Sequence, residues 1–283
     1  MGDDRIRFDI VMPIHNISDE YFIRAVDSVL NQSYRRWRLI VIESLASATA
    51  SNRKKKELLA EYDDSRFVYA LQKGVGVSEA RNYGSTLESN GFIAFLDGDD
   101  CWEFNHLECM ANAIKDAPEH SVVFFSRLGK PLQLRSALTG QTHNRMLEYA
   151  PYDEIEMFRP EDYYYYFMAH PLFPSACVVR RNAFEAVGGF DEAMLRCEDM
   201  DLFMKLFHPD NDWIGTFVDT ITVYREPSVE AHKISAEDTD WVAVLEERYP
   251  YPMMWEKPDN VSNDYWEELL GHIQENQRRF TLK

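Results

Sequence analysis

Short apolar runs alternate with segments of helical periodicity through the first half of this chain. The apolar runs cover residues 8–14, 37–43, 66–71, 91–96 and 121–126, and they have the length of buried strands rather than of helices. Helical patterns fall between them, at 52–62, 77–89 and 103–116, and also at 21–30 after Ser18, which is a good N-cap residue. This alternation predicts an α/β fold with a doubly wound, mostly parallel, Rossmann-like sheet.

The pattern weakens in the second half of the chain. Periodicity fades over residues 129–159, which indicates a long loop or an excursion over a site. Beyond it, we expect a tyrosine-rich helix at 160–169, a strand at 174–180 and a helix at 198–207. The acidic and aromatic stretch after residue 226 is predicted to be an appended element, with a helix at 265–278.

Composition excludes several classes of protein. The 283 residues are 45% hydrophobic and 28% charged, which is typical of a folded globular chain. The formal net charge of −18 argues against a nucleic-acid partner, because phosphate binding requires an excess of Lys and Arg on some face. An anionic ligand would need a cation or local basic residues to approach so acidic a chain.

The lack of targeting signals, together with the spacing of the cysteines, leads us to expect a cytoplasmic protein. The first residues lack the basic and apolar segments of a signal peptide, and no apolar run reaches the roughly 20 residues of a transmembrane helix. The four cysteines, at positions 101, 109, 177 and 197, have no C-x-x-C spacing. We therefore expect four reduced thiols, with neither a zinc site nor a disulfide framework.

Polar residues gather where the predicted strands end, which is where parallel sheets bind ligands. The most pronounced group is Asp97-Gly98-Asp99-Asp100, directly after the strand at 91–96. Carboxylates this close repel one another, and a bound cation usually compensates them; Mg²⁺ or Mn²⁺ suits oxygen ligands. A solvated acidic turn is the alternative interpretation.

Two other segments have features of a site. A glycine turn at 74–76 opens a helix that carries Arg81, an arrangement suited to phosphate or nucleotide contacts, although a simple strand-to-helix connection explains it equally. Gly188-Gly189-Phe190-Asp191 precedes Glu198-Asp199 at the start of a predicted helix. One of these carboxylates could act as a general base, and acids that complement the helix dipole are the alternative.

Taken in order, the motifs resemble those of family 2 glycosyltransferases. The resemblance extends over about residues 8–226 and rests on five stretches: Val11-Met12-Pro13-Ile14-His15-Asn16, Ala80-Arg81-Asn82, Phe95-Leu96-Asp97-Gly98-Asp99-Asp100, Gly188-Gly189-Phe190-Asp191 and Glu198-Asp199.

The resemblance implies a GT-A fold over residues 1–226, with a nucleotide-binding half at about 1–127, an acceptor-binding half at about 128–226 and a mostly helical C-terminal extension at 227–283. It also implies a nucleoside-diphosphate sugar donor, with a UDP-sugar favoured. A divalent cation, Mn²⁺ or Mg²⁺, and inversion at the anomeric carbon belong to the same expectation. The acceptor would be a carbohydrate or glycolipid of cell-surface polysaccharide assembly.

The family's functional residues are carried over position by position. Asp97 and Asp99 would form the D-x-D pair, with Asp99 the first choice as metal ligand and Asp97 facing the ribose or the metal. Asp199 matches the general base, which would take the proton of the acceptor hydroxyl. The residues expected to border the nucleoside are Pro13, His15, Asn16 and Glu43, with Arg81 nearby.

The sequence departs from the family pattern at two places. Glu43-Ser44-Leu45-Ala46 stands where the family usually has Asp-Asp-Gly-Ser, which leaves recognition of the base open. Tyr224-Arg225 is followed by Glu226-Pro227 instead of a stretch that ends in histidine. The nearest histidine is His232, a candidate third ligand of the metal or diphosphate, for which a surface position is the alternative.

Two other functions compete with sugar transfer. A nucleotidyltransferase would carry a basic glycine-rich loop after the first strand, where this chain has Pro13-Ile14-His15-Asn16. A sugar-nucleotide binding module without turnover is the second alternative; the altered Glu43-Ser44 region favours it, whereas the presence of Asp99 and Asp199 argues against it.

Overall fold

The computed structural model describes residues 6–50, 54–135, 142–149, 157–158, 172–224 and 248. Its strands are β1 (Phe8–Ile14), β2 (Trp37–Glu43), β3 (Phe67–Leu71), β4 (Phe92–Phe95), β5 (Cys101–Trp102), β6 (Ser121–Arg135), β7 (Thr142–Tyr149), β8 (Met157–Phe158), β9 (Cys177–Arg180) and β10 (Ile214–Tyr224). Its helices are α1 (Asp19–Leu30), α2 (Leu45–Ala50), α3 (Lys54–Ala60), α4 (Val77–Ser85), α5 (His106–Asp116), α7 (Arg181–Ala186) and α8 (Glu198–Leu206), with short 3₁₀ turns η1 (Pro174–Ala176) and η2 (Pro209–Asn211).

One mixed sheet runs through the molecule in the order β3-β2-β1-β4-β9-β6-β10-β5. The first four strands of this order are parallel, in the register that pairs Phe8 with Trp37 and Phe92. β9 is antiparallel to both β4 and β6, whereas β6 and β10 are parallel. The α/β layered fold is confirmed, with parallel pairing concentrated in the N-terminal half.

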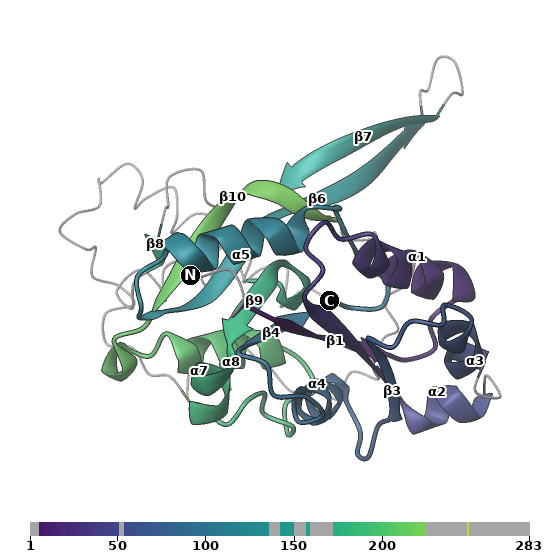
Figure 1. Cartoon of the computed structure of the whole chain (residues 1–283), viewed down its shortest axis with the longest axis horizontal. Coiled ribbons are helices and arrows are strands. Elements are labelled where there is room, and N and C mark those ends of the chain that lie inside the picture. Colours follow the sequence, from purple (N-terminus) through teal and green to yellow (C-terminus); the bar gives the residue numbers. More distant parts are fainter. Residues whose placement is uncertain are drawn as a thin grey trace.

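Alternating side chains of the strands build a core on each face of the sheet. Ile10 and Met12 of β1 pack with the buried faces of α1 and α5, while Val11 packs on the other face with α4, α7 and α8. Figure 1 shows these two groups of helices on opposite sides of the sheet. A fully covered sheet accounts for the nearly continuous apolar sequences of β1, β2 and β4.

The helix predicted after Ser18 is confirmed as α1. The side chain of Ser18 accepts a hydrogen bond from the backbone N–H of Tyr21 and caps α1. All four cysteines are free thiols. Within the described residues, no helix is long and apolar enough to cross a membrane.

Of the two alternatives for residues 129–159, the long loop is wrong where the structure describes that region, and the excursion over a site stays a prediction. β6 continues to Arg135 and pairs antiparallel with β7, and Figure 1 shows the two as a ribbon that extends away from the sheet. Pro131 lies within β6, and a proline normally argues against a strand interior, which explains the error. The expected helices at 160–169 and 265–278 lie outside the described residues.

A buried ion pair ties the start of β1 to α7. The carboxylate of Asp9 is fully buried and accepts hydrogen bonds from Arg181 Nη2 at 2.6 Å and from the backbone and side-chain N–H groups of Asn90 at 2.9 and 2.6 Å. Arg181 also donates to the carbonyl of Ser85 at the end of α4. This network fixes α7 and the end of α4, the helix that carries Arg81, against β1.

Candidate active site

The acidic run follows β4 as a tight turn. The N–H of Asp100 donates to the carbonyl of Asp97 at 3.0 Å, and the N–H of Asp97 donates to Ser175 Oγ at 3.1 Å. The carbonyl of Ser175 accepts in turn from the indole of Trp102 at 2.8 Å. Ser175 and Trp102 therefore support the turn. Asp99 is exposed and Asp97 is partly exposed at the carboxyl end of the parallel strands.

Arg81 connects the acidic turn to α8. Its Nη2 lies 2.8 Å from Asp97 Oδ1 and its Nη1 lies 2.9 Å from Glu198 Oε1, while its own side chain is only 4% exposed. Burial opposes the charge on Arg81, but Asp97 and Glu198 overcome this and raise its pKa. Its Nε–H is buried without a hydrogen-bond partner among the residues that the structure describes.

Asp199 lies beside this pair in the first turn of α8. Its Oδ1 accepts a hydrogen bond from the N–H of Met200 at 2.8 Å. Burial, and after it the charge of Glu198, raises the pKa of Asp199 to about 7, although Arg81 acts in the opposite direction. A carboxylate with such a pKa is suited to accept a proton near neutral pH.

The glycine pair at 188–189 places a loop between α4 and α8. Both glycines have positive φ, +77° at Gly188 and +68° at Gly189, and a Cβ at Gly189 would lie 2.6 Å from Asn82 Oδ1. The side chain of Asn82 bonds both backbone groups of Phe190, the residue after Gly189. It accepts from the Phe190 N–H and donates to the Phe190 carbonyl, each at 2.9 Å. Arg81 lies 5.1 Å from the centre of the Phe190 ring. The loop thus closes on the helix that carries Arg81.

The residues expected around the nucleoside lie at the ends of β1 and β2. His15 and Asn16 are exposed; His15 Nδ1 is 2.6 Å from Ser44 Oγ, and the N–H of Asn16 donates to Ser47. Pro13 is partly buried at the end of β1. Glu43, in contrast, is fully buried and accepts a hydrogen bond from Tyr69 at 2.6 Å. In this structure, His15 and Asn16 therefore present the accessible polar groups at this edge.

The acidic turn fits a divalent cation. Asp97 and Asp99, separated by one residue, offer the hard oxygen donors that Mg²⁺ and Mn²⁺ prefer. Within the described ranges, no group of three or more His, Cys, Asp or Glu side chains is arranged to hold a metal. Two carboxylates suffice where a substrate diphosphate and water complete the coordination, which is common for Mg²⁺. His232 lies outside the described residues, and its role stays a prediction.

The comparison with protein families decides the classification. The model of the family described as "Glycosyl transferase family 2" matches residues 9–188, more than half of the chain. This chain belongs to glycosyl transferase family 2. The match includes Arg81, Asp97 and Asp99 and ends before α8.

Curated relatives are glycosyltransferases that match in part. The chain is 37% identical over 100 residues to the Escherichia coli "UDP-Glc:alpha-D-GlcNAc-diphosphoundecaprenol beta-1,3-glucosyltransferase WfgD", covering 35% of this chain and 37% of that protein. It is 24% identical over 210 residues to the "Amylovoran biosynthesis glycosyltransferase AmsB" of Erwinia amylovora, covering 71% and 64%. The chain matches only 15% of the Streptococcus pneumoniae "Glycosyltransferase GlyA", with 30% identity over 40% of its own length.

Solved structures of low sequence identity share the fold. TarS of S. aureus in complex with UDP-GlcNAc superposes with a TM-score of 0.65 at 15% identity, covering 97% of this chain and 73% of that one. The mannosyltransferase PcManGT of Pyrobaculum calidifontis, in complex with GDP-Man and Mn²⁺, gives a TM-score of 0.52 at 15% identity over 81% and 59%. The GT-A fold is thereby confirmed for this family 2 chain.

The structure brings together part of the predicted site and adds to it. Arg81, Asp97 and Asp199 converge, whereas His15 and Asn16 lie along the strand edge toward β2. The sequence did not assign Glu198 as the partner of Arg81, nor Ser175 as the support of the acidic turn. Both contacts join segments far apart in the chain, so spacing alone gave no signal for them.

Proposed function

We propose that this chain transfers a sugar from a nucleoside-diphosphate sugar, with UDP-sugars favoured, to the hydroxyl of a carbohydrate or glycolipid acceptor with inversion. The observation that carries the proposal is the Arg81 bridge between Asp97 and Glu198, with Asp199 beside it. An inverting transfer needs one polar site at the leaving diphosphate and a base on the opposite side of the sugar. The acidic turn and α8 meet these two needs from different halves of the fold.

The chain's own residues would perform distinct steps. Asp97 and Asp99 would hold the divalent cation, Mn²⁺ or Mg²⁺, which neutralises charge on the departing diphosphate. Arg81, with its unpartnered Nε–H, would donate to the donor phosphates while it keeps Asp97 oriented. Asp199 would accept the proton of the acceptor hydroxyl as its oxygen attacks the anomeric carbon.

The setting of the reaction follows from the relatives and the composition. Relatives named for O-antigen, teichoic acid and amylovoran biosynthesis support cell-surface polysaccharide or glycolipid assembly. Four free thiols fit a reducing compartment, so we propose the cytoplasm. We also propose the predicted organisation, with the GT-A domain at 1–226 divided near residue 127 and an extension at 227–283.

Donor binding is the first test. Thermal unfolding would be followed with UDP, UDP-Glc, UDP-GlcNAc and GDP-Man, each with and without Mn²⁺, because a ligand that binds only the native state raises the melting temperature. We expect a metal-dependent shift with the uridine compounds, lost in Asp99→Ala and kept in the control Asp116→Ala, an exposed carboxylate at the end of α5. No shift with any compound would refute donor binding.

Turnover is the second test. Asp199→Asn should keep the donor-induced shift and lower the rate of transfer about 10²- to 10⁴-fold, the usual contribution of a general base. Transfer at the wild-type rate in this variant would exclude Asp199 as the base. Donor binding without turnover in the wild-type chain would instead favour the binding-module alternative.

A further inference from the structure

Asp201 is a buried acid on α8 that the proposed reaction does not use. Its side chain is fully buried, two positions after Asp199. Lys205 Nζ lies 2.9 Å from its Oδ2 and Arg248 Nη1 lies 2.8 Å from its Oδ1. A carboxylate removed from water is strongly unfavourable unless cations and hydrogen bonds replace its hydration, so these two cations stabilise the position of α8.

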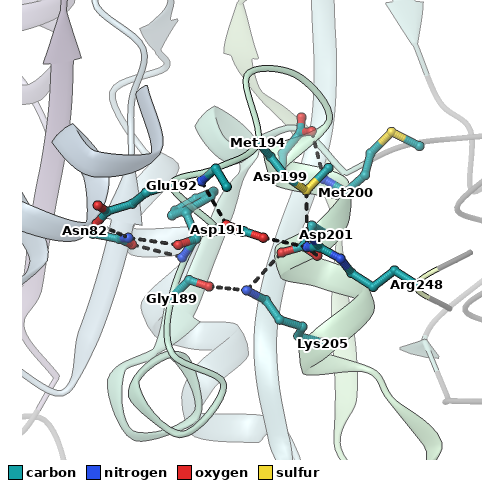
Figure 2. Close-up of polar contacts among 12 residues, drawn as sticks. Asn82, Gly189, Asp191, Glu192, Met194, Asp199, Met200, Asp201, Lys205 and Arg248 are labelled. Atoms are coloured by element: carbon teal, nitrogen blue, oxygen red, sulfur yellow. Dashed lines mark hydrogen bonds and ion pairs between the residues drawn. The ribbon is translucent and has the colours of Figure 1, made fainter. Parts of the chain in front are cut away.

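Arg248 joins α8 to the loop that follows the glycine pair. The same Nη1 lies 2.7 Å from Asp191 Oδ2 and 3.6 Å from Met194 Sδ. Figure 2 shows the Arg248 side chain reaching between the loop and the helix, with Asp191 and Asp201 turned toward it. We call Arg248, Asp191 and Asp201 the Arg248 clasp.

A second cation strengthens the same junction. Lys205 donates to the carbonyl of Gly189 at 2.6 Å while it pairs with Asp201. The loop is in turn fixed to α4, because Asn82 binds both backbone groups of Phe190. α8, the loop and α4 therefore form one connected unit around Asp199.

The clasp contacts α8 at Asp201, on the side opposite Asp199. Residues two apart in an α-helix differ by about 200°, so Asp199 and Asp201 point to opposite faces. Glu198 and Asp201 are three residues apart and so lie on the same side of α8, where Arg81 holds the first and Arg248 holds the second. The first turn of α8, and with it the orientation of Asp199, is thus held through these two neighbouring carboxylates.

We propose that Arg248 is a positioning residue, which fixes the first turn of α8 and thereby directs Asp199 toward the acceptor. This rests on the proposed function for the role of Asp199, but not for the clasp itself. Arg248 lies beyond the family match at 9–188 and within the predicted extension at 227–283. The extension would then contribute a residue to the catalytic half rather than form an independent unit.

Kinetics give the first test. We expect Arg248→Ala to lower kcat about 10- to 100-fold, because small displacements of a catalytic group have effects of this size, with the donor KM changed less than about twofold. Arg248→Lys should recover part of the loss, since it restores one charge. The matched control is Arg38→Ala, which removes an exposed ion pair with Glu88 at 3.1 Å on the opposite half of the sheet and should leave kcat unchanged.

A double-mutant cycle tests the proposed cause. Asp201→Asn removes the buried charge that Arg248 compensates, so Arg248→Ala should lower kcat only about twofold in that background. An equal loss in both backgrounds would contradict the clasp as the cause.

Hydrogen exchange measured by mass spectrometry gives a readout that needs no turnover. In Arg248→Ala, amides of α8 should exchange at least about tenfold faster than in the wild type, while those of α1, capped by Ser18, should be unchanged. Unchanged kcat together with unchanged α8 exchange would overturn the proposal, even if the melting temperature falls. Faster exchange in α8 with no turnover in the wild-type chain would refute the proposed function and leave the clasp standing.

Discussion

Replacing Asp199 by Asn should make the fold more stable at alkaline pH. Burial, and after it the charge of Glu198, raises the pKa of Asp199 from its ordinary 3.8 to about 7. The native state therefore binds more protons than the unfolded state between about pH 4 and pH 7, and this acid removes stability as the pH rises through that range. Asparagine keeps an oxygen that can accept from the N–H of Met200 but does not ionise.

The size of the effect follows from the shift. Three units at about 1.4 kcal/mol each correspond to about 4 kcal/mol for complete ionisation of Asp199. Part of this is already lost at pH 5, because the unfolded carboxyl is ionised there. The gain of Asp199→Asn over the wild type should therefore grow by about 3 kcal/mol from pH 5 to pH 8.

Urea unfolding, followed by the fluorescence of the six tryptophans, would measure the difference at both pH values. The control is Asp116→Asn, which changes an exposed carboxylate at the end of α5 and should give the same difference at pH 5 and pH 8. A pH-independent difference between wild type and Asp199→Asn would refute the reasoning, because it would mean that Asp199 ionises as easily in the folded chain as in the unfolded one.

Three further substitutions test other contacts. Gly84→Ala would place a Cβ 2.5 Å from Val11 Cγ1, so we expect its melting temperature to fall and its free energy of unfolding to drop by about 1–3 kcal/mol; an increase in both would contradict the close approach of α4 to β1. Arg181→Ala leaves Asp9 buried without its cation, and urea unfolding should show a loss of about 3–5 kcal/mol; less than 1 kcal/mol would show that the pair is solvated. Burial lowers the pKa of His106 to about 3, so this residue reduces stability as the pH falls below about 6.5. His106→Asn should remove about 2 kcal/mol of the stability lost between pH 7 and pH 5, and an unchanged pH slope would contradict a neutral, buried imidazole.

The strands and helices of the N-terminal half were predictable because their signals are local. Each of β1, β2 and β4 is a short apolar run, and α1 has both a cap and an apolar face. Direction within the sheet was predictable only where a helix connects two strands. A helix was also expected before β9, at 160–169, yet β9 runs antiparallel to β4 and β6, so the alternation did not give its direction.

The site was predictable as a set of positions but not as a set of contacts. The order of motifs identified Asp97 and Asp199, and the structure brings both to Arg81. The pairing of Arg81 with Glu198 joins residues 117 positions apart, and no periodicity reports a contact of that range. The contact between Arg248 and Asp201 could not be predicted for the same reason, because no local sequence feature identifies Arg248 as the partner of a buried acid.

The features that suit Asp199 for catalysis also make it unfavourable for folding. Burial and the neighbouring charge of Glu198 raise its pKa toward neutrality, which makes the carboxylate a better base and its ionised form less stable. A helix that carries such a carboxylate needs other contacts that hold it in place. α8 has them in two places, through Arg81 at Glu198 and through Lys205 and Arg248 at Asp201. We therefore interpret the buried ion pairs around α8 as the contacts that hold the Asp199 carboxylate in place although its ionised form is unfavourable there.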